Sequence, residues 1–414
     1  MVSFLAGLRN HRWTVLGIVA YALFMDYFIY GLIVPLGPYS PAKVTSQSQL
    51  GVLYGSYALG VLVATPIFGY LGDRMGCRRP MIIGVALSAL ATALFCCGAH
   101  YYLVIVARMA QGAAAAATWT AGLALIAENY PDKRVQMMGL AMVGSTAGSV
   151  VGPLAGGWLF DKGGYELPFL ITAAMVAIDA CLLIALLPKD KGVAQKSPDL
   201  KAILLDRSVL VAGLSVAVAA AGWGIIEPLL PDQLRQLGAS PGQVGLLFTI
   251  STIAYGFAAP LVAWVSEKIT IKKTICFGIC AMSLALPLLA LARGLPLIGL
   301  SLCLVNVSYA FVLNPTSAEL GNAVDRRGMS CYAAVYAVYN ITYSLGMMGA
   351  DFFASTAAEH LSFLYILLSM SVMLLLCIPL ILKGVAVSVA PVAQPAVVAQ
   401  DASPSSPESL ARDP

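Results

Sequence analysis

The sequence is short of charge. Only 11% of its 414 residues are Asp, Glu, Lys or Arg, and 59% are hydrophobic, whereas a soluble domain carries about 25% charged residues. So few charges cannot cover a water-facing surface of this size, which excludes an ordinary soluble globular protein. Repeated apolar runs of about 20 residues have the length that a helix needs to cross a bilayer. We therefore predict an all-α polytopic membrane protein.

The sequence also lacks the motifs on which many enzyme and metal sites depend. It has no phosphate-binding P-loop, no zinc-ligand spacing and no nucleophile elbow, and its nine cysteines are scattered through apolar runs. Direct use of ATP is therefore not expected. We predict a protein that is not an enzyme, with no cofactor, no metal and no nucleic-acid partner.

The apolar runs can be drawn as membrane spans. A polar linker at 188–207 separates an N-terminal half, 1–187, from a C-terminal half, 208–383. The tail, 384–414, is rich in Pro, Ala, Val and Ser, and we expect it to be a disordered cytoplasmic segment. Judged by length, twelve transmembrane helices are predicted, at 13–36, 49–71, 80–98, 101–129, 136–159, 167–187, 208–230, 243–265, 273–293, 296–322, 329–352 and 360–383.

Basic residues collect on one side of these spans. Most of the 24 Lys and Arg residues lie at the N-terminus, in the linker, at the start of the tail and in the loops that follow even-numbered spans. The loops on the other side hold only Lys43, Lys162, Arg235 and Arg293. Because Lys and Arg favour the cytoplasmic side, we expect both termini in the cytoplasm. We further expect a monomer embedded in the lipid bilayer of a bacterial inner membrane.

The two halves repeat each other. The segment "PIFGYLGDRMGCRRPMIIG" begins at Pro66, and "PLVAWVSEKITIKKTICFG" begins at Pro260. In this alignment Asp73 falls on Glu267, and each segment follows the second span of its half. Two six-helix halves of the same orientation make a parallel repeat about an axis along the membrane normal. That arrangement is typical of transporters whose substrate site lies between two rocking halves.

Three segments, in order along the chain, resemble signatures of the major facilitator superfamily. "GYLGDRMGCRR" (69–79) resembles the loop after the second helix, "RMAQG" (108–112) a signature of the fourth helix, and "GSVVGPLAGG" (148–157) the fifth-helix signature of antiporters. The resemblance implies secondary transport of a small-molecule substrate by the twelve-helix fold. The gating loop that it implies contains Gly69, Asp73, Arg74, Gly76, Arg78 and, through the repeat, Glu267. The antiporter helix contains Gly148, Gly152, Pro153, Gly156 and Gly157.

The finer resemblance is to the drug:proton antiporter branch and its vesicular amine transporter relatives. It rests on "MDYFIYGLIVPLGP" in the first span, "GWGIIEPLLP" in the seventh and "VYAVYN" in the eleventh. The chain departs from the amine carriers at Asn340, where they have an aspartate, and at Tyr57, where they have a lysine. The resemblance implies proton-coupled antiport that exports small amphipathic or cationic organic molecules, as in multidrug efflux.

Four polar residues are candidates for proton coupling or substrate binding. Because an ionisable side chain mid-span costs at least about 2.5–3.5 kcal/mol, it is expected to face a cavity or a partner. Asp26 lies mid-span in the first helix, Arg108 lies within the fourth, Glu227 lies in the seventh, and Asn340 lies in the eleventh. The alternatives are a structural ion pair between Asp26 and Arg108, an Asp26 satisfied by its helix neighbours, and an interfacial position for Glu227.

Asp73 is an acid in a loop that otherwise holds bases. We expect it to pair across the cytoplasmic seam with a base or a helix N-terminus, and the alternative is a local pair with Arg78. Aromatic residues beside the acids would suit an organic cation. The candidates are Tyr27, Tyr30, Tyr54, Tyr57, Trp119, Trp223, Tyr255, Tyr336, Tyr339 and Tyr343.

Two other functions remain open. One is transport of a neutral or anionic metabolite, with Asn340 marking a lost amine-binding acid. The other is a non-transporting receptor or scaffold on the transporter fold. The intact gating motifs argue against a scaffold, which has no need of them.

Overall fold

The structure is a computed structural model that describes residues 11–40, 46–98, 100–130, 133–187, 207–326 and 332–384. Within these ranges every long element is a helix, as the composition predicts. Of the predicted linker, 188–207, and the predicted tail, 384–414, only Arg207 and Gly384 lie within the described residues.

Each half of the chain contributes six spans. The N-terminal spans are α2 (Arg12–Ile33) with η1 (Val34–Tyr39), α3 (Gln47–Met75), α4 (Arg78–Cys96), α5 (Tyr101–Ala117) with η2 (Thr118–Gly122) and α6 (Leu123–Asn129), α7 (Arg134–Gly163), and α8 (Glu166–Leu186). The C-terminal spans are α10 (Arg207–Gly224) with α11 (Ile226–Gln236), α12 (Pro241–Ile269), α13 (Ile271–Leu291), α14 (Leu295–Arg326), α15 (Tyr332–Ala357) and α16 (Phe363–Gly384). In the described chain, 11 of these spans are long and apolar enough to cross a membrane. The remaining one, α15, has 26 residues, and the predicted twelve-helix fold is confirmed.

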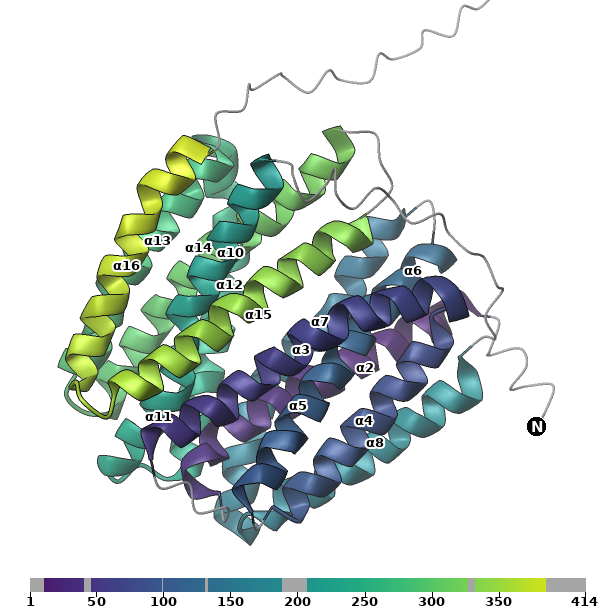
Figure 1. Ribbon diagram of the computed structural model, residues 1–414, viewed down its shortest axis with the longest axis horizontal. Coiled ribbons are helices and arrows are strands. Elements are labelled where there is room, and N and C mark those ends of the chain that lie inside the picture. Colours follow the sequence, from purple (N-terminus) through teal and green to yellow (C-terminus); the bar gives the residue numbers. More distant parts are fainter. Residues whose placement is uncertain are drawn as a thin grey trace, which may run out of the picture.

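The halves lie beside each other and meet along α3, α15, α7 and α12 (Figure 1). Odd-numbered spans begin, and even-numbered spans end, on the side that carries Arg12, Arg74 and Arg78, which we call the base-rich side. The opposite side carries the connections from η1 to α3 and from α11 to α12. Large apolar side chains cover the outward faces, with Phe257 81% exposed. Such a surface fits the hydrocarbon of a bilayer, because lipid tails are as apolar as these side chains.

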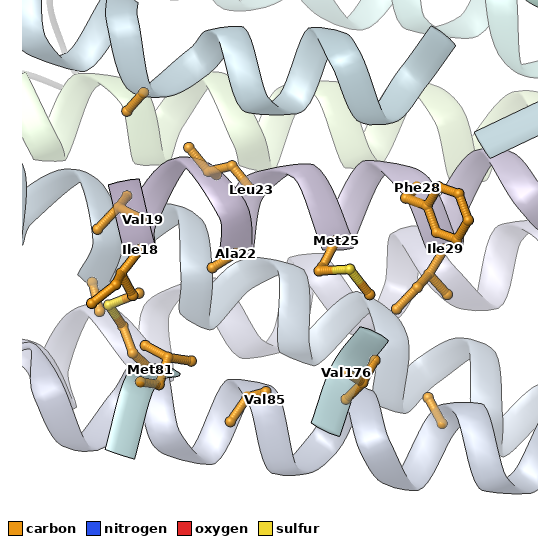
Figure 2. Close-up of a cluster of buried hydrophobic side chains, with 14 of the residues drawn as sticks. Ile18, Val19, Ala22, Leu23, Met25, Phe28, Ile29, Met81, Val85 and Val176 are labelled. Carbon is orange, nitrogen blue, oxygen red and sulfur yellow. The ribbon is translucent and has the colours of Figure 1, made fainter. Parts of the chain in front are cut away.

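Each half has its own hydrophobic core. In the N-terminal half, α2 packs mainly on α7 and also on α8, and its buried side chains belong to the core of this half. Figure 2 shows Ile18 and Met25 of α2 pointing toward the layer that carries Met81 and Val85 of α4 and Val176 of α8. The buried faces of α2 therefore hold the first span in place, and the polar residues on this helix are fixed with it.

The repeat seen in the sequence also appears in the backbone. Both α3 and α12 begin with a capping box, formed by Ser46 and Gln49 in one half and by Ser240 and Gln243 in the other. In a capping box the two side chains satisfy helix N–H groups that have no partner within the helix. The two helices also end alike, because Gly76 (φ 80°) and Thr270 (φ 86°) follow them in the same left-handed region.

Thr270 provides a test of this backbone match. A β-branched residue is strained at positive φ, and the Thr270 side chain makes no capping hydrogen bond to α13. We expect Thr270→Gly to stabilise the protein by about 1 kcal/mol, measured as a higher midpoint of thermal unfolding in detergent. Gly76→Thr, the matched change in the other half, should lower the midpoint. A lower midpoint for Thr270→Gly would contradict the argument.

Candidate functional site

Hydrogen bonds join the two halves at the side of the protein opposite the base-rich side, which we call the opposite side. The Asp161 carboxylate of α7 accepts from the Ser240 hydroxyl (3.0 Å) and from the Gly242 backbone N–H (3.1 Å), at the first turn of α12. The Gln47 side-chain amide donates to Asp232 (2.5 Å), which also forms an ion pair with Arg235 at 2.7 Å. The Asp161 carboxylate also lies where the α12 helix dipole favours a negative charge.

Small residues let the halves approach closely on this side. A side chain at Gly51 or Gly55 of α3 would collide with or press on α15, and one at Gly245 of α12 would collide with the backbone of Pro153 in α7. Toward the base-rich side, Gly69 of α3 and Gly256 of α12 have open space where a side chain would be. The halves are therefore sealed at the opposite side and separate toward the base-rich side.

The antiporter helix packs on both of its neighbours. A side chain at Gly148, Gly152 or Gly156 would collide with the backbone of α2, as the four-residue spacing predicts for one close-packed face. Gly157 instead lies against Pro241 of α12, and Pro153 contacts both neighbours, with its ring against Gly31 of α2 and its carbonyl against Gly245 of α12. This segment is thus part of the contact between the halves.

A cavity of about 530 Å³, including space open to solvent, lies between the halves. Its wall comes from α2, α3, α5 and η2 on one side and from α15 on the other. It is lined by Tyr27, Tyr30, Tyr54, Tyr57, Ala58, Val61, Ala115, Ala116, Trp119, Asn340, Tyr343, Ser344, Met347 and Asp351. Six of the aromatic residues singled out in the sequence therefore meet here. Trp119 is carried by the π-helix η2, a distortion that recurs at functional sites.

Arg108 is fully buried beside this wall. Its guanidinium carbon lies 5.0 Å from the ring centroid of Tyr54, 5.6 Å from that of Tyr30 and 5.8 Å from that of Tyr57. Its Nη1 donates to the Gln111 side chain at 3.1 Å, whereas Nε and Nη2 have no partner among the described residues. Within this part of the chain Arg108 forms no ion pair with Asp26, and its charge is stabilised by aromatic faces.

Glu227 is buried in α11 and joins the two halves. The Tyr30 hydroxyl of α2 donates to its Oε2 (2.5 Å), and the Trp223 indole donates to its Oε1 (2.8 Å). Glu227 is 2% exposed and is therefore enclosed by the protein. Both carboxylate oxygens are already engaged.

Asp26 lies inside the N-terminal half and is not among the residues that line the cavity. It is buried, its hydrogen-bond partner is Thr118, and Asp179 of α8 is its nearest acidic neighbour. Its Oδ2 has no partner within the described chain. Asn340, by contrast, lines the cavity from α15.

One acidic residue of the cavity was not singled out in the sequence. Asp351 of α15 is 1% exposed, lines the cavity, and has no hydrogen-bond partner for either carboxylate oxygen among the described residues. The spacing from Asn340 could have revealed Asp351, because positions 340 and 351 are three helical turns apart and therefore share one face of α15.

The gating-loop residues gather at the base-rich side, away from the cavity. Arg74 lies over the Tyr70 ring at 4.7 Å, and Arg78 donates to the Ile184 carbonyl at the end of α8 (3.1 Å). Glu267 is exposed at the end of α12. Asp73 is in the last turn of α3, but its side chain lies outside the described residues, so its predicted pairing stays a prediction.

The comparison with known families agrees with this geometry. The family model described as "Major Facilitator Superfamily" matches residues 16–217 and again 212–414. The chain belongs to the Major Facilitator Superfamily. The two matches correspond to the two six-helix halves. As a member of this superfamily, the protein is an integral membrane transporter and not an enzyme.

Curated relatives within the superfamily carry the names of amine carriers. The chain is 25% identical over 394 residues to a vesicular acetylcholine transporter of Drosophila melanogaster, with 86% of this chain and 68% of the relative aligned. It is 31% identical over 308 residues to a chromaffin granule amine transporter of Rattus norvegicus. That alignment covers 72% of this chain but only 58% of the relative.

Solved structures of other superfamily transporters share the fold. The nucleoside transporter NupG has a TM-score of 0.71 at 15% identity, with 90% of this chain and 100% of NupG covered. A POT family transporter in complex with 5-aminolevulinic acid has a TM-score of 0.72 at 10% identity, with 89% and 95% covered. At such low identity these similarities concern the fold alone.

The contact made by Asp161 can be tested directly. Asp161→Ala removes two hydrogen bonds to a charged group at an exposed position, worth about 1–2 kcal/mol, which would shift an equilibrium between two states about tenfold. We expect a cysteine introduced at Gln47 to react faster with a membrane-impermeant thiol reagent in this variant. Lys162→Ala is the control, because Lys162 lies over the Trp158 ring of its own helix. Equal labelling of all three proteins would contradict a seal at this position.

Proposed function

We propose that this protein is a proton-coupled antiporter that exports small amphipathic or cationic organic molecules. The observation that carries the proposal is the cavity between the halves, whose wall includes six aromatic residues and a carboxyl group. Aromatic faces attract organic cations through their ring quadrupoles, and a carboxylate adds charge complementarity. The names of the relatives, amine and acetylcholine transporters, support a cationic cargo.

We assign proton coupling to the N-terminal half. Asp26 is buried with an unpartnered oxygen, and Arg108 is buried near the cavity. A carboxyl group in such a place exchanges a proton only when a change of conformation gives it access to water, which is what coupling requires. Glu227 and Asn340 are assigned to the substrate side of the mechanism, because they lie beside and in the cavity wall.

In this proposal, the conformation that is sealed at the opposite side and separated toward the base-rich side is one end state of the transport cycle. In the other state the base-rich side closes, and Asp73 and Glu267, related by the repeat, meet partners in the opposite half. We propose that the base-rich side faces the cytoplasm, so that both termini are cytoplasmic. The proposed location is a bacterial inner membrane, with the protein as a monomer and drug-like cations among its cargo.

The runner-up is transport of a neutral or anionic metabolite. It is favoured by the unpartnered Nε and Nη2 of Arg108, which could bind an anion, and by the neutral Asn340. The rings of Tyr30, Tyr54 and Tyr57 already surround the guanidinium, however, and the carboxyl group of Asp351 in the cavity wall favours a cation there.

Purified protein in liposomes would test the function. With an acidic lumen, protons leave as cargo enters, so we expect accumulation of ethidium that a proton ionophore abolishes. A set of anionic and neutral dyes serves as the comparison. Gradient-driven accumulation of those dyes without ethidium would favour the metabolite alternative.

Asp26 is the residue to change in the same assay. Asp26→Asn removes the proton site and leaves the cavity wall intact, so we expect gradient-driven ethidium uptake to fall at least tenfold while equilibrium binding of ethidium persists. Expression and unfolding midpoint should stay close to those of the parent protein. Undiminished uptake would remove Asp26 from the coupling mechanism.

A further inference from the structure

Besides Asp179 and the ion-paired Asp232, the described chain holds three buried acids, Asp26, Glu227 and Asp351, that could meet a cationic cargo. Asp26 is enclosed in the N-terminal half, beside Thr118 and Asp179, and does not line the cavity. Glu227 has one oxygen occupied by the Tyr30 hydroxyl and the other by the Trp223 indole. Neither acid has a free oxygen at the cavity surface.

Asp351 differs from both. It lines the cavity, is 1% exposed, and has no hydrogen-bond donor on either oxygen within the described residues. A buried polar group without a partner is costly, so a carboxyl group kept in this place points to an occupant that the protein itself does not supply. The aromatic residues Tyr30, Tyr54 and Tyr343 line the same cavity.

We propose that Asp351 is the cargo-binding carboxylate of the cavity, and that an organic cation and a proton occupy it in turn. This inference rests on the proposed function, since it names the residue that the cationic cargo meets. Asn340, on the same face of α15 and about 16 Å along the helix axis, carries no charge. The acid that fixes the cargo thus lies near the sealed end of the cavity, next to the contact of α15 with Gly55 of α3.

The surrounding charges allow this exchange. The charged groups whose fields reach Asp351 are Glu227 of α11 and Arg108 of α5, and the titratable hydroxyls of Tyr30 and Tyr54 share its cavity. Arg108 and Glu227 carry opposite charges, so their fields at Asp351 oppose each other. When a cation binds, the O–H bond of the neutral acid breaks, the proton passes to water, and the carboxylate keeps the electron pair. When the cation leaves, a proton from water restores the acid.

The test measures binding and proton release in the same protein. Full-length protein in detergent is titrated with tetraphenylphosphonium at several pH values, and released protons are followed with an indicator dye in weak buffer. Tetraphenylborate, of the same shape and opposite charge, is the ligand control. Asp351→Asn keeps the shape of the side chain and removes its charge. Ser355→Ala is the matched variant, because Ser355 lies one turn along α15 and packs on Gly51 without lining the cavity.

For the parent protein and Ser355→Ala we expect tetraphenylphosphonium to bind, to bind more weakly at lower pH, and to release protons. For Asp351→Asn we expect at least tenfold weaker binding, loss of its pH dependence, and loss of proton release, with an unchanged unfolding midpoint. Unchanged binding and proton release in Asp351→Asn would overturn the assignment of Asp351 alone. Failure of the parent protein to bind this cation, with binding of tetraphenylborate instead, would overturn the cationic function itself.

Discussion

A charge inside a bilayer has no water to solvate it, so the protein must supply every partner. Arg108 illustrates this constraint, since it is fully buried, faces three tyrosine rings and donates to Gln111. Glu227 is held in the same way by donors from two helices, Tyr30 of α2 and Trp223 of α10. These contacts place part of the cavity wall, because Tyr30, Tyr54 and Tyr57 both surround Arg108 and line the cavity.

Small residues decide where the halves can seal. Gly51 and Gly55 bring α3 onto α15, and Gly157 and Gly245 bring α7 and α12 together. In lipid no hydrophobic driving force brings helices together, so close packing at small residues of this kind is what stabilises their association. The seal is completed by Asp161 at the first turn of α12. Because hydrogen bonds at exposed positions are individually weak, those of Asp161 add only modestly to this packing.

Much of the fold could be read from the sequence, because span length, basic-residue bias and the internal repeat each report on the bilayer directly. The repeat extended to features not foreseen, such as the capping boxes at Ser46 and Ser240. The site was predicted less completely. In the eleventh span the resemblance directed attention to Asn340, where the amine carriers have an aspartate. The acid that lines the cavity is instead Asp351, which lies on the same helix face. One hydrogen bond to the Glu227 carboxylate comes from Tyr30 in the other half. No local sequence pattern reveals a partner so distant in the chain.

The two halves contribute unlike charges to the cavity. The N-terminal half supplies the guanidinium of Arg108 and most of the tyrosines, whereas the C-terminal half supplies Glu227 and Asp351. A rocking motion of one half against the other therefore changes the distance between the buried cation and the acids. Asp351 also lies where α15 packs on Gly55, so in the proposed mechanism opening of the opposite side would separate the helix pair that covers this carboxylate. In such an arrangement access to the cavity and the charge state of its acid change together, which is the linkage that antiport requires.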